Sequence, residues 1–370
     1  MFRHENGEKI MKKHLWTICF STCLFAFTLY VLLDTFVITR AWQTNITAID
    51  TSFIQSAVPT DFVLTDDIAA ESSDIPLISA GAVNTIEAVQ TDNPAPLPAS
   101  NRPGSRKKKR SETAEPSEKS ITETVSASGT AAGNSYDDGY IKISMQTYEV
   151  EGTAVYVADV ELSSIEYLKT AFAHDIYGKN VTAKTSEIAS AHNAILAING
   201  DYYGAQEKGY VIRNGILFRD TAGNSDVLCI NADGSLSIVT PGTVSAEELL
   251  EQGVWQAFSF GPALIADGEI AVSEKTEVGR AKASNPRTAI GIIDDLHYVF
   301  VVSDGRTDES EGLSLYELAG FLQQIGVKTA YNLDGGGSST MVFNGKVINN
   351  PTTSGSSIKE RSISDIIYIG

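Results

Sequence analysis

One uncharged, largely apolar run near the N-terminus constrains most strongly what this chain can fold into. Residues 15–33 contain no Asp, Glu, Lys or Arg, and they lie between Lys13 and Asp34. A run of this length can cross the hydrocarbon core of a bilayer as a helix, and the basic flank predicts that the N-terminus stays in the cytoplasm. A cleaved signal peptide is the alternative, although its apolar region is usually shorter and no small-x-small site follows directly. We expect residues 1–14 to be a cytoplasmic N-terminus and residues 15–33 an uncleaved transmembrane signal anchor.

The next segment, residues 34–139, has the composition of a linker. It is rich in Ser, Thr, Ala, Pro and acidic residues, and it has no sustained hydrophobic period. Such a composition cannot bury enough apolar surface to offset chain entropy, so we predict a disordered extracellular stalk. A basic run at residues 106–110 has two interpretations. It is either an electrostatic tether to anionic wall polymer or lipid headgroups, or a solvated run of charge, and we favour the second.

From residue 140 to residue 370 the pattern is that of a folded domain. Residues 141–145 alternate between apolar and polar types, and residues 153–160 read as a strand. Asn-Gly and Asp-Gly pairs between apolar runs predict hairpins, at Asn214-Gly215, Asp233-Gly234 and Asp267-Gly268. Helices are expected at residues 186–193 and after Ser314, which forms a capping box with Glu317. We therefore predict an α+β fold with mixed, mainly antiparallel sheets and a few packed helices.

Charge, cysteines and histidines exclude several classes of function. The net charge is -18 and no basic-aromatic face occurs in the C-terminal half, so nucleic acid is not an expected partner. Cys229 is the one cysteine beyond the anchor, so the exported part can form no internal disulfide; a buried strand position is expected for it. No histidine pair has the spacing of zinc ligands. Walker A, G-x-G-x-x-G and G-x-S-x-G sequences are absent, which argues against nucleotide binding and a serine hydrolase.

Candidate catalytic groups follow three predicted strands. Each strand ends in a carboxylate and turn residues, so the three ends could converge on one rim of a sheet, with Asp201, Asp304 and Asp334 as candidate catalytic residues. Neighbouring carboxylates shift each other's pKa values and can divide the roles of acid and base. Guanidinium groups can hold phosphate bidentately, and the candidates for this are Arg287, Arg306 and Arg361.

The most unusual of these strand ends is the glycine loop, residues 335–337, which follows Asp334. Glycines leave no Cβ in the way of a ligand, and successive N–H groups in such a turn can form a nest for an anion. The further candidates for binding substrate or phosphate are Asn199, Gly200, Gly335, Gly336, Gly337, Ser338, Ser339 and Thr340.

Taken together, these motifs resemble the phosphodiester glycosidase family. The resemblance extends over residues 140–370 and is carried in order by Ala197-Ile198-Asn199-Gly200-Asp201-Tyr202-Tyr203, Ser259-Phe260-Gly261-Pro262, Asn285-Pro286-Arg287-Thr288-Ala289-Ile290-Gly291, Ser303-Asp304-Gly305-Arg306, Asn332-Leu333-Asp334-Gly335-Gly336-Gly337-Ser338-Ser339-Thr340 and Glu360-Arg361. It implies hydrolysis of a sugar-1-phosphodiester at the glycosidic C–O bond, releasing a free sugar and a phosphomonoester.

Three hypotheses follow. The first is a membrane-anchored extracellular glycosidase acting on a phosphodiester-linked saccharide or wall glycopolymer of the cell envelope. The second is a non-catalytic wall module that binds saccharide or phosphate, and the third is a phosphodiesterase that cleaves the P–O bond at a two-metal centre. We favour the first. The sequence assigns no cofactor and leaves open a divalent cation that would assist the leaving phosphate.

Overall fold

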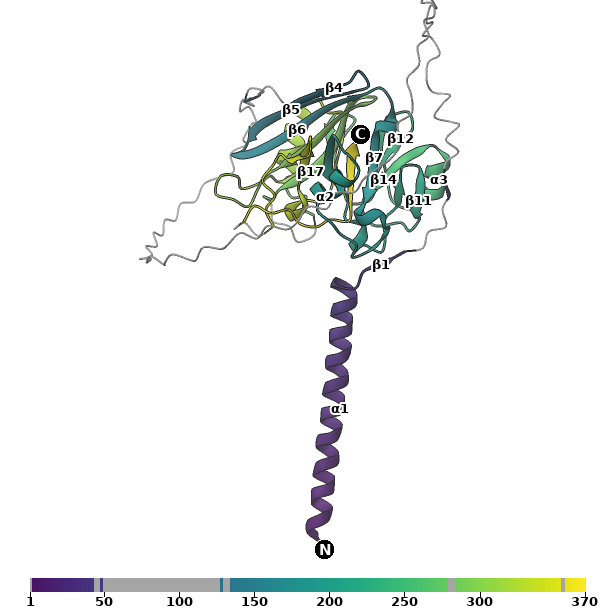
Figure 1. Cartoon of the computed structure of the whole chain (residues 1–370), viewed down its shortest axis with the longest axis vertical. Coiled ribbons are helices and arrows are strands. Elements are labelled where there is room, and N and C mark those ends of the chain that lie inside the picture. The colour runs from purple at the N-terminus through teal and green to yellow at the C-terminus, as the bar shows by residue number, and fades with distance from the viewer. Residues whose placement is uncertain (1, 43–46, 49–126, 129–133, 279–283, 354–356) are drawn as a thin grey trace, which may run out of the picture. The chain divides into compact units, whose positions relative to one another are not determined.

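The computed structural model describes residues 2–42, 47–48, 127–128, 134–278, 284–353 and 357–370. Its helices are α1 (Phe2–Phe36), α2 (Thr185–Ala191), α3 (Ala246–Glu251) and α4 (Leu315–Gln324), with short 3₁₀ turns at η2 (Ile165–Tyr167), η3 (Ala173–Asp175), η4 (Tyr203–Ala205) and η5 (Gly336–Ser338). Among the described residues, every strand pairing is antiparallel, which confirms the predicted fold class for the folded domain (Figure 1).

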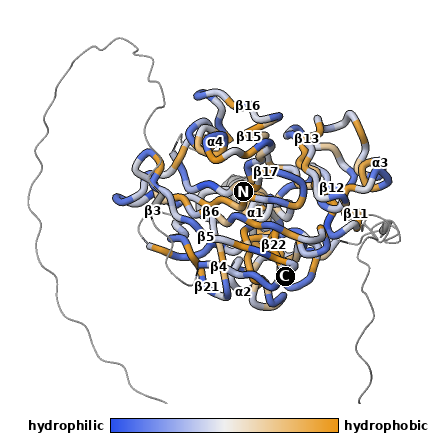
Figure 2. Tube along the Cα trace, turned by 90° about the horizontal axis from the view of Figure 1, so that it is seen from above, coloured by the Kyte–Doolittle hydropathy of each residue, from blue (hydrophilic) through white to orange (hydrophobic). Residues whose placement is uncertain are grey.

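The largest sheet forms the centre of the domain. Its strands are β3 (Ala127–Ser128), β4 (Ser135–Asp137), β5 (Ile141–Val150), β6 (Thr153–Leu162), β15 (Ala263–Ala266), β16 (Glu269–Ile270), β17 (Arg287–Asp294), β18 (His297–Ser303) and β19 (Thr329–Asn332). They pair in the order β16-β15-β19-β17-β18-β6-β5-β3, and β4 also pairs with β5. The alternation of β5 is visible in Figure 2, where hydrophobic and hydrophilic residues follow one another along the strand.

Two further sheets complete the core. One consists of β2 (Thr47–Ala48), β10 (Val211–Arg213), β11 (Ile216–Arg219), β12 (Val227–Asn231), β13 (Leu236–Val239) and β14 (Val254–Phe258). The other consists of β7 (Leu168–Phe172), β9 (Leu196–Asn199), β20 (Met341–Phe343), β21 (Lys346–Val347) and β22 (Asp365–Ile369). The predicted hairpins join β10 to β11, β12 to β13 and β15 to β16, so all three are confirmed.

Strands β17 and β18 of the central sheet are buried on both faces. Phe300 of β18 packs with Ile198 and Ile367 of the β9 sheet, whereas its neighbour Val301 packs with Leu318 of α4 on the opposite face. The predicted capping box of α4 is present, with Ser314 Oγ accepting from the N–H of Glu317. Cys229 lies fully buried in β12, as predicted, and burial raises the pKa of its thiol to about 12. Such a thiol is inert at neutral pH.

The range predicted as stalk contains strands at both of its ends. β1 (Arg40–Ala41) pairs with β8 (Gly178–Lys179), and β2 pairs with β11. Towards the other end, β3 and β4 pair with β5, so the folded domain begins before residue 140. Disorder is therefore the wrong prediction for these segments, because their main chain bonds to domain strands that lie far along the chain. The basic run at residues 106–110 lies outside the described residues.

The predicted membrane anchor falls within α1. Side chains described between Leu15 and Leu33 are exposed, among them Leu24, Phe25 and Phe27. Over the described residues, no helix meets the length and apolarity needed to cross a bilayer, so the predicted span is not confirmed.

Candidate active site

Strand register brings three loops together at one edge of the central sheet. Ala289 is opposite Asn332, and Arg287 is opposite Ser303 in the neighbouring pair. Because these strands are antiparallel, the start of β17 lies beside the ends of β18 and β19. The prediction that strand ends converge is confirmed for the segments that carry Arg306 and Asp334, and the start of β17 brings Arg287 beside them.

Asn199 joins this edge to the sheet that contains β9. Its Nδ2 donates to the carbonyl of Asp334 at 2.6 Å, and its Oδ1 accepts from Thr288 Oγ1 at 2.9 Å and from the N–H of Thr340 at 3.2 Å. The side chain is fully buried. Asn199 therefore holds the glycine loop in place through these hydrogen bonds, and its buried side chain does not face a ligand.

The glycine loop packs closely against two other segments. A Cβ on Gly335 would lie 2.9 Å from the carbonyl of Pro286, and one on Gly336, whose φ is +63°, would lie 2.7 Å from Arg306 Nη2. A Cβ on Gly337 would lie 2.7 Å from Thr353 Oγ1. The glycines do allow a close approach, but here it is the approach of the chain's own segments.

Three N–H groups of the glycine loop are bonded within the protein and do not form the predicted anion nest. The N–H of Gly336 donates to Pro286 O, and those of Ser338 and Ser339 donate to Gly335 O and Gly336 O. These donors are consumed within the protein, so they do not converge on an open position.

A cleft of about 290 Å³ opens at this edge of the sheet. It is bordered by aromatic, amide, arginine and glycine residues together with one carboxylate. The described lining residues are Tyr202, Phe260, Val278, Asn285, Arg287, Arg306, Asn332, Asp334, Gly335, Gly336 and Arg361.

Asp334 contributes the carboxylate of this cleft. Its Oδ2 lies 3.0 Å from Arg361 Nη2 and accepts a short hydrogen bond from Ser338 Oγ. Burial raises the pKa of Asp334 above that of an ordinary carboxyl, although Arg361 and Ser338 oppose the shift by favouring the charged form. Ser338 is the one predicted hydroxyl that bonds to this carboxylate among the residues described.

Three guanidinium groups line the same cleft as this carboxylate. Arg287 Nε donates to Leu313 O at 2.8 Å, and burial lowers the pKa of this guanidinium to about 10, which leaves it charged at neutral pH. Arg306 donates to Asn285 Oδ1 and to Thr353 O, and its backbone is left-handed at φ +64°. With Arg361 they give the described lining three cations and a single carboxylate, an excess of positive charge suited to an anion.

Asp201, predicted as catalytic, lies outside the lining of this cleft. It is buried, with Oδ1 2.9 Å from Arg213 Nη2 and Oδ2 accepting from the N–H of Ser259 at 2.8 Å. Arg213 also pairs with Asp365 at 2.9 Å, and burial raises the pKa of Asp365 to about 7. Asp201 thus belongs to a buried ion cluster and shapes the loop before Tyr202.

Asp304 likewise forms its hydrogen bonds with other residues of the protein. It accepts from the N–H and the Nδ2 of Asn350, at 2.8 and 2.9 Å, and from Tyr156 Oη at 3.1 Å. Burial, together with the charge and the hydrogen bond of Asp304, raises the pKa of Tyr156. The prediction that several carboxylates share the site is wrong for these two aspartates, because buried partners far along the chain satisfy them.

Gly200, Ser339 and Thr340, the remaining residues predicted to bind substrate or phosphate, are buried near the cleft. Gly200 packs on Asp365, where a Cβ would lie 2.2 Å from Oδ1. Ser339 and Thr340 are buried, and neither hydroxyl has a hydrogen-bond partner among the described residues. None of these three lines the cleft.

Sequence reasoning missed five residues of the lining; one is Val278, and the other four belong to motifs that carried the family resemblance. Asn332 is buried and donates to Gly261 O, while its Oδ1 has no hydrogen-bond partner among the described residues. Tyr202 has a left-handed backbone and is 45% exposed. Two signals could have identified the other two of these four. Asn285 lies two positions before Arg287, and Phe260 directly precedes Gly261-Pro262.

The described residues contain one group of side chains with metal-ligand spacing, and it is not part of this cleft. Asp159, Glu161 and His297 lie close together on β6 and β18, with His297 Nε2 3.0 Å from Asp159 Oδ1. None of them borders the cleft.

Comparison with known proteins supports the resemblance. The phosphodiester glycosidase (NAGPA) family model matches residues 192–370, a range that includes every residue described as lining the cleft. The SPbeta prophage-derived uncharacterized protein YomE of Bacillus subtilis (strain 168) is 27% identical over 236 residues, 58% of this chain and 37% of that protein. N-acetylglucosamine-1-phosphodiester alpha-N-acetylglucosaminidase of Mus musculus is 35% identical over 159 residues, 39% of this chain and 30% of that protein.

A solved structure shares the fold. The catalytic domain of zebrafish N-acetylglucosamine-1-phosphodiester alpha-N-acetylglucosaminidase, auto-inhibited by its pro-peptide, superposes with a TM-score of 0.51 at 22% identity, covering 66% of this chain and 87% of that one. This chain spans about a third of the length of the curated relatives it matches. Residues 192–370, just under half of the chain, therefore form a region that matches the model of the phosphodiester glycosidase family.

Proposed function

We propose that this chain is a hydrolase that cleaves the glycosidic bond of a sugar-1-phosphodiester and releases a free sugar and a phosphomonoester. One observation carries the proposal: Asp334 lies in a cleft whose described lining adds three arginines to that single carboxylate. The family match and the activity named for the mouse relative support the same reaction class.

The substrate's phosphodiester would be held by the arginines. Each phosphodiester carries one negative charge, and the fork of an arginine matches two phosphate oxygens. Arg287, Arg306 and Arg361 would therefore place the phosphate at one end of the cleft. The aromatic faces of Tyr202 and Phe260 would pack against the sugar.

Asp334 would then act at the anomeric carbon, as a nucleophile or as the base for an attacking water. Ser338 and Arg361 donate to its Oδ2 and favour its charged form, whereas burial raises its pKa. Retention of configuration would indicate the nucleophile, and inversion the base. The bond that breaks joins the anomeric carbon to the phosphate oxygen, and the oxygen of water ends on the sugar.

A single carboxylate suffices because the leaving group is a phosphomonoester. Its second ionisation has a pKa of about 6, so it departs as an anion without the strong general acid that an alkoxide needs. The arginines would stabilise the charge that develops on it. This argument makes the absence of Asp201 and Asp304 from the described lining compatible with glycosidase chemistry.

The substrate in the cell would be a phosphodiester-linked saccharide of the envelope, such as a teichoic-acid-like or capsular polymer, met on the outer side of the membrane. This part of the proposal rests on the N-terminal apolar run and its basic flank.

The test uses the full chain in detergent and N-acetylglucosamine-1-phospho-methyl ester, with a panel of other sugar-1-phosphodiesters. We expect free sugar from the wild type and from Asp267→Asn, whose carboxylate lies exposed in a hairpin, and none from Asp334→Asn. Parallel assays with and without a chelator decide whether a divalent cation takes part.

Two other outcomes would overturn the proposal. Release of a sugar phosphate would mean cleavage of the P–O bond, as in a phosphodiesterase. Saturable binding of the panel without turnover would mean a binding module of the cell wall.

A further inference from the structure

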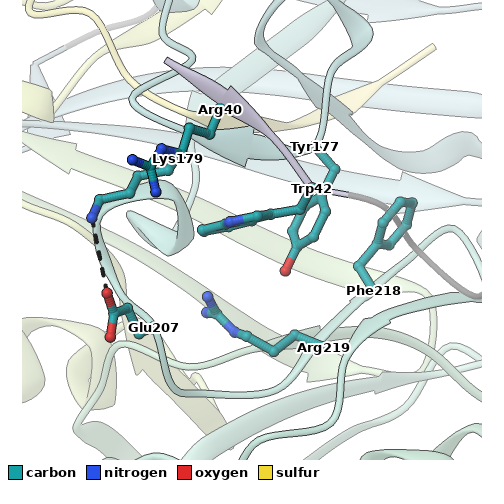
Figure 3. A pocket seen from close by; sticks show the side chains of 7 residues that line it. All are labelled: Arg40, Trp42, Tyr177, Lys179, Glu207, Phe218 and Arg219. Atoms are coloured by element: carbon teal, nitrogen blue, oxygen red, sulfur yellow. Dashed lines mark ion pairs between the residues drawn. The ribbon is translucent and has the colours of Figure 1, made fainter. Parts of the chain in front are cut away.

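We propose that the segment from Ile38 to Trp42, called here the strap, is a positioning element for the loop that presents Tyr202 to the cleft. The strap lies outside the residues matched by the family model. It docks against the folded domain at β8 and contributes Trp42 to an aromatic cluster (Figure 3).

The main chain of the strap is bonded to β8 on both sides of β1. Arg40 pairs with Lys179 and Ala41 with Gly178. The N–H of Trp42 donates to Tyr177 O at 2.8 Å, and Asn180 Nδ2 donates to Ile38 O at 3.0 Å. The strap thus pairs with β8 as a short strand, and hydrogen bonds hold it at both ends.

Gly178 is shaped for this contact. A Cβ there would lie 2.1 Å from the carbonyl oxygen of Arg40, and the three nearest atoms all belong to Arg40 and Ala41. Its φ is not among the positive values of the chain, so the backbone itself does not demand glycine. The docked strap is what excludes a side chain at this position.

The side chain of Trp42 completes a cluster that reaches the cleft loop. Its ring centroid lies 4.9 Å from that of Tyr177 and 6.3 Å from that of Tyr203, and the Tyr177 and Tyr203 rings stack at 5.2 Å. Figure 3 shows the Trp42 ring beside Tyr177, and the guanidinium carbon of Arg219 lies 6.0 Å from the centroid of the Trp42 ring. Arg219 in turn donates to Tyr203 O and, at 2.6 Å, to Gln206 O.

Tyr202 depends on neighbours that this cluster holds. Its φ of +66° is strained for a residue with a Cβ, so adjoining contacts must maintain it. On one side Asp201 is fixed by Arg213, and on the other Tyr203 is 1% exposed within the cluster. The N–H of Asn180, next to β8, also donates to Gly204 O at 3.4 Å.

These contacts form one connected path. Trp42 packs on Tyr177, Tyr177 stacks on Tyr203, and Tyr203 fixes the backbone from which Tyr202 lines the cleft. The strap is therefore expected to hold the wall of the cleft in its working position. The kinetic part of this inference rests on the proposed function, whereas the part about the loop does not.

The test compares Gly178→Val, Trp42→Ala and the control Val37→Ala, an exposed residue before the strap, in the full chain in detergent. Hydrogen exchange is followed at residues 203–206, where the N–H groups of Ala205 and Gln206 bond to Tyr202 O and Tyr203 O. We expect exchange there to rise about tenfold in the first two variants and to stay unchanged in the control and in β12.

Kinetics separate positioning from mere stabilisation. Both strap variants should lose about tenfold in kcat for the sugar phosphodiester while the affinity for inorganic phosphate, held by the arginines, stays the same. Unchanged exchange at residues 203–206 would overturn the inference. So would higher activity in the variants, since the strap would then obstruct the cleft. If the wild type cleaves no sugar phosphodiester, the proposed function fails and the exchange data still decide the role of the strap.

Discussion

Arg361 Nη2 lies 3.0 Å from Oδ2 of Asp334, and the same Nη2 also approaches Ser338 Oγ. One guanidinium thus faces both the carboxylate and the hydroxyl that donates to it. The Arg361 side chain is 40% exposed, which leaves part of it open to a ligand in the cleft. In the proposed reaction, this relationship would tie phosphate binding to the ionisation of the candidate catalytic group.

Replacement of Arg361 by Gln should move the acidic limb of the kcat/KM profile to higher pH. Burial already raises the pKa of Asp334, and Arg361 opposes that shift, so loss of the cation raises the pKa further. Because Asp334 acts as a carboxylate in the proposed reaction, activity would be lost earlier as the pH falls. The pH–rate profile measures this, with the exposed Lys346→Gln as control. A limb that moves to lower pH would contradict the role given to Asp334.

Replacement of Arg306 by Gln should weaken phosphate binding. The loss of one of three cations from the described lining should raise the inhibition constant of inorganic phosphate about tenfold. Competition against the sugar phosphodiester provides the measurement. Because Arg306 also donates hydrogen bonds to Asn285 and Thr353, a melting curve of the variant is needed to detect a loss of stability. Unchanged inhibition with unchanged melting would remove Arg306 from the phosphate site.

Gly336→Ala should abolish most activity, whereas Gly345→Ala should retain it. Both glycines have positive φ, +63° and +75°, so both variants carry similar backbone strain of about 1 kcal/mol. Only at Gly336 does the added methyl meet a neighbour, Arg306 Nη2 at 2.7 Å; at Gly345 nothing lies within 4 Å. Assays of both variants at one temperature test this pair. An equal loss of activity in the two variants would show that backbone strain, and not the contact with Arg306, causes the loss.

The buried cluster of Arg213, Asp201 and Asp365 should dominate the pH dependence of stability. Burial, with the charge of Asp201, raises the pKa of Asp365 to about 7, against the lowering effect of Arg213. The folded state therefore holds a proton that the unfolded state releases near pH 4, and the free energy of unfolding falls as the pH rises from about 4 to about 7. Urea unfolding across this range should show the slope in the wild type and its loss in Asp365→Asn.

Arg213→Met should be far more damaging than Asp365→Asn. It would leave two carboxylates buried without their cation, at a cost of about 3–5 kcal/mol. Urea unfolding at pH 7 measures the difference. A second substitution, Asp365→Asn, made in the Arg213→Met chain should recover part of the loss, and failure to do so would mean that the cost is one of packing.

Residues 15–33 predict that the chain stays with the membrane fraction. The expected result is retention in the pellet after alkaline washing of membranes, and release when Leu24 and Phe27 are both replaced by Arg, since charges at the bilayer centre oppose insertion. A wild-type chain found in the wash would contradict the predicted anchor.

Local sequence pattern predicted much of the fold. The Asn-Gly and Asp-Gly hairpins, the capping box at Ser314 and the alternation along β5 depend on residues close together in the chain. The register of β17 with β18 and β19 then places Arg287 at the edge that carries Asp334.

Two aspartates show where local pattern fails. Asp201 and Asp304 follow buried strands just as Asp334 does, although only Asp334 is followed by three glycines. Their partners lie outside the local motifs. Asp201 bonds to Arg213, 12 positions away, and to the N–H of Ser259, 58 positions away. Asp304 bonds to Asn350, 46 positions away. A carboxylate is available to a ligand only if no buried partner consumes it, which the sequence around it does not encode.

The amino-acid sequence by itself determined the strands, the turns, the glycine loop and the family, because each depends on short-range conformational preference or on the order of motifs. Tertiary structure alone decided which carboxylate lines the cleft, that the loop's N–H groups are consumed internally, and that Trp42 packs on Tyr177. Those outcomes depend on side chains brought together from distant positions, where burial favours a partner for most polar groups.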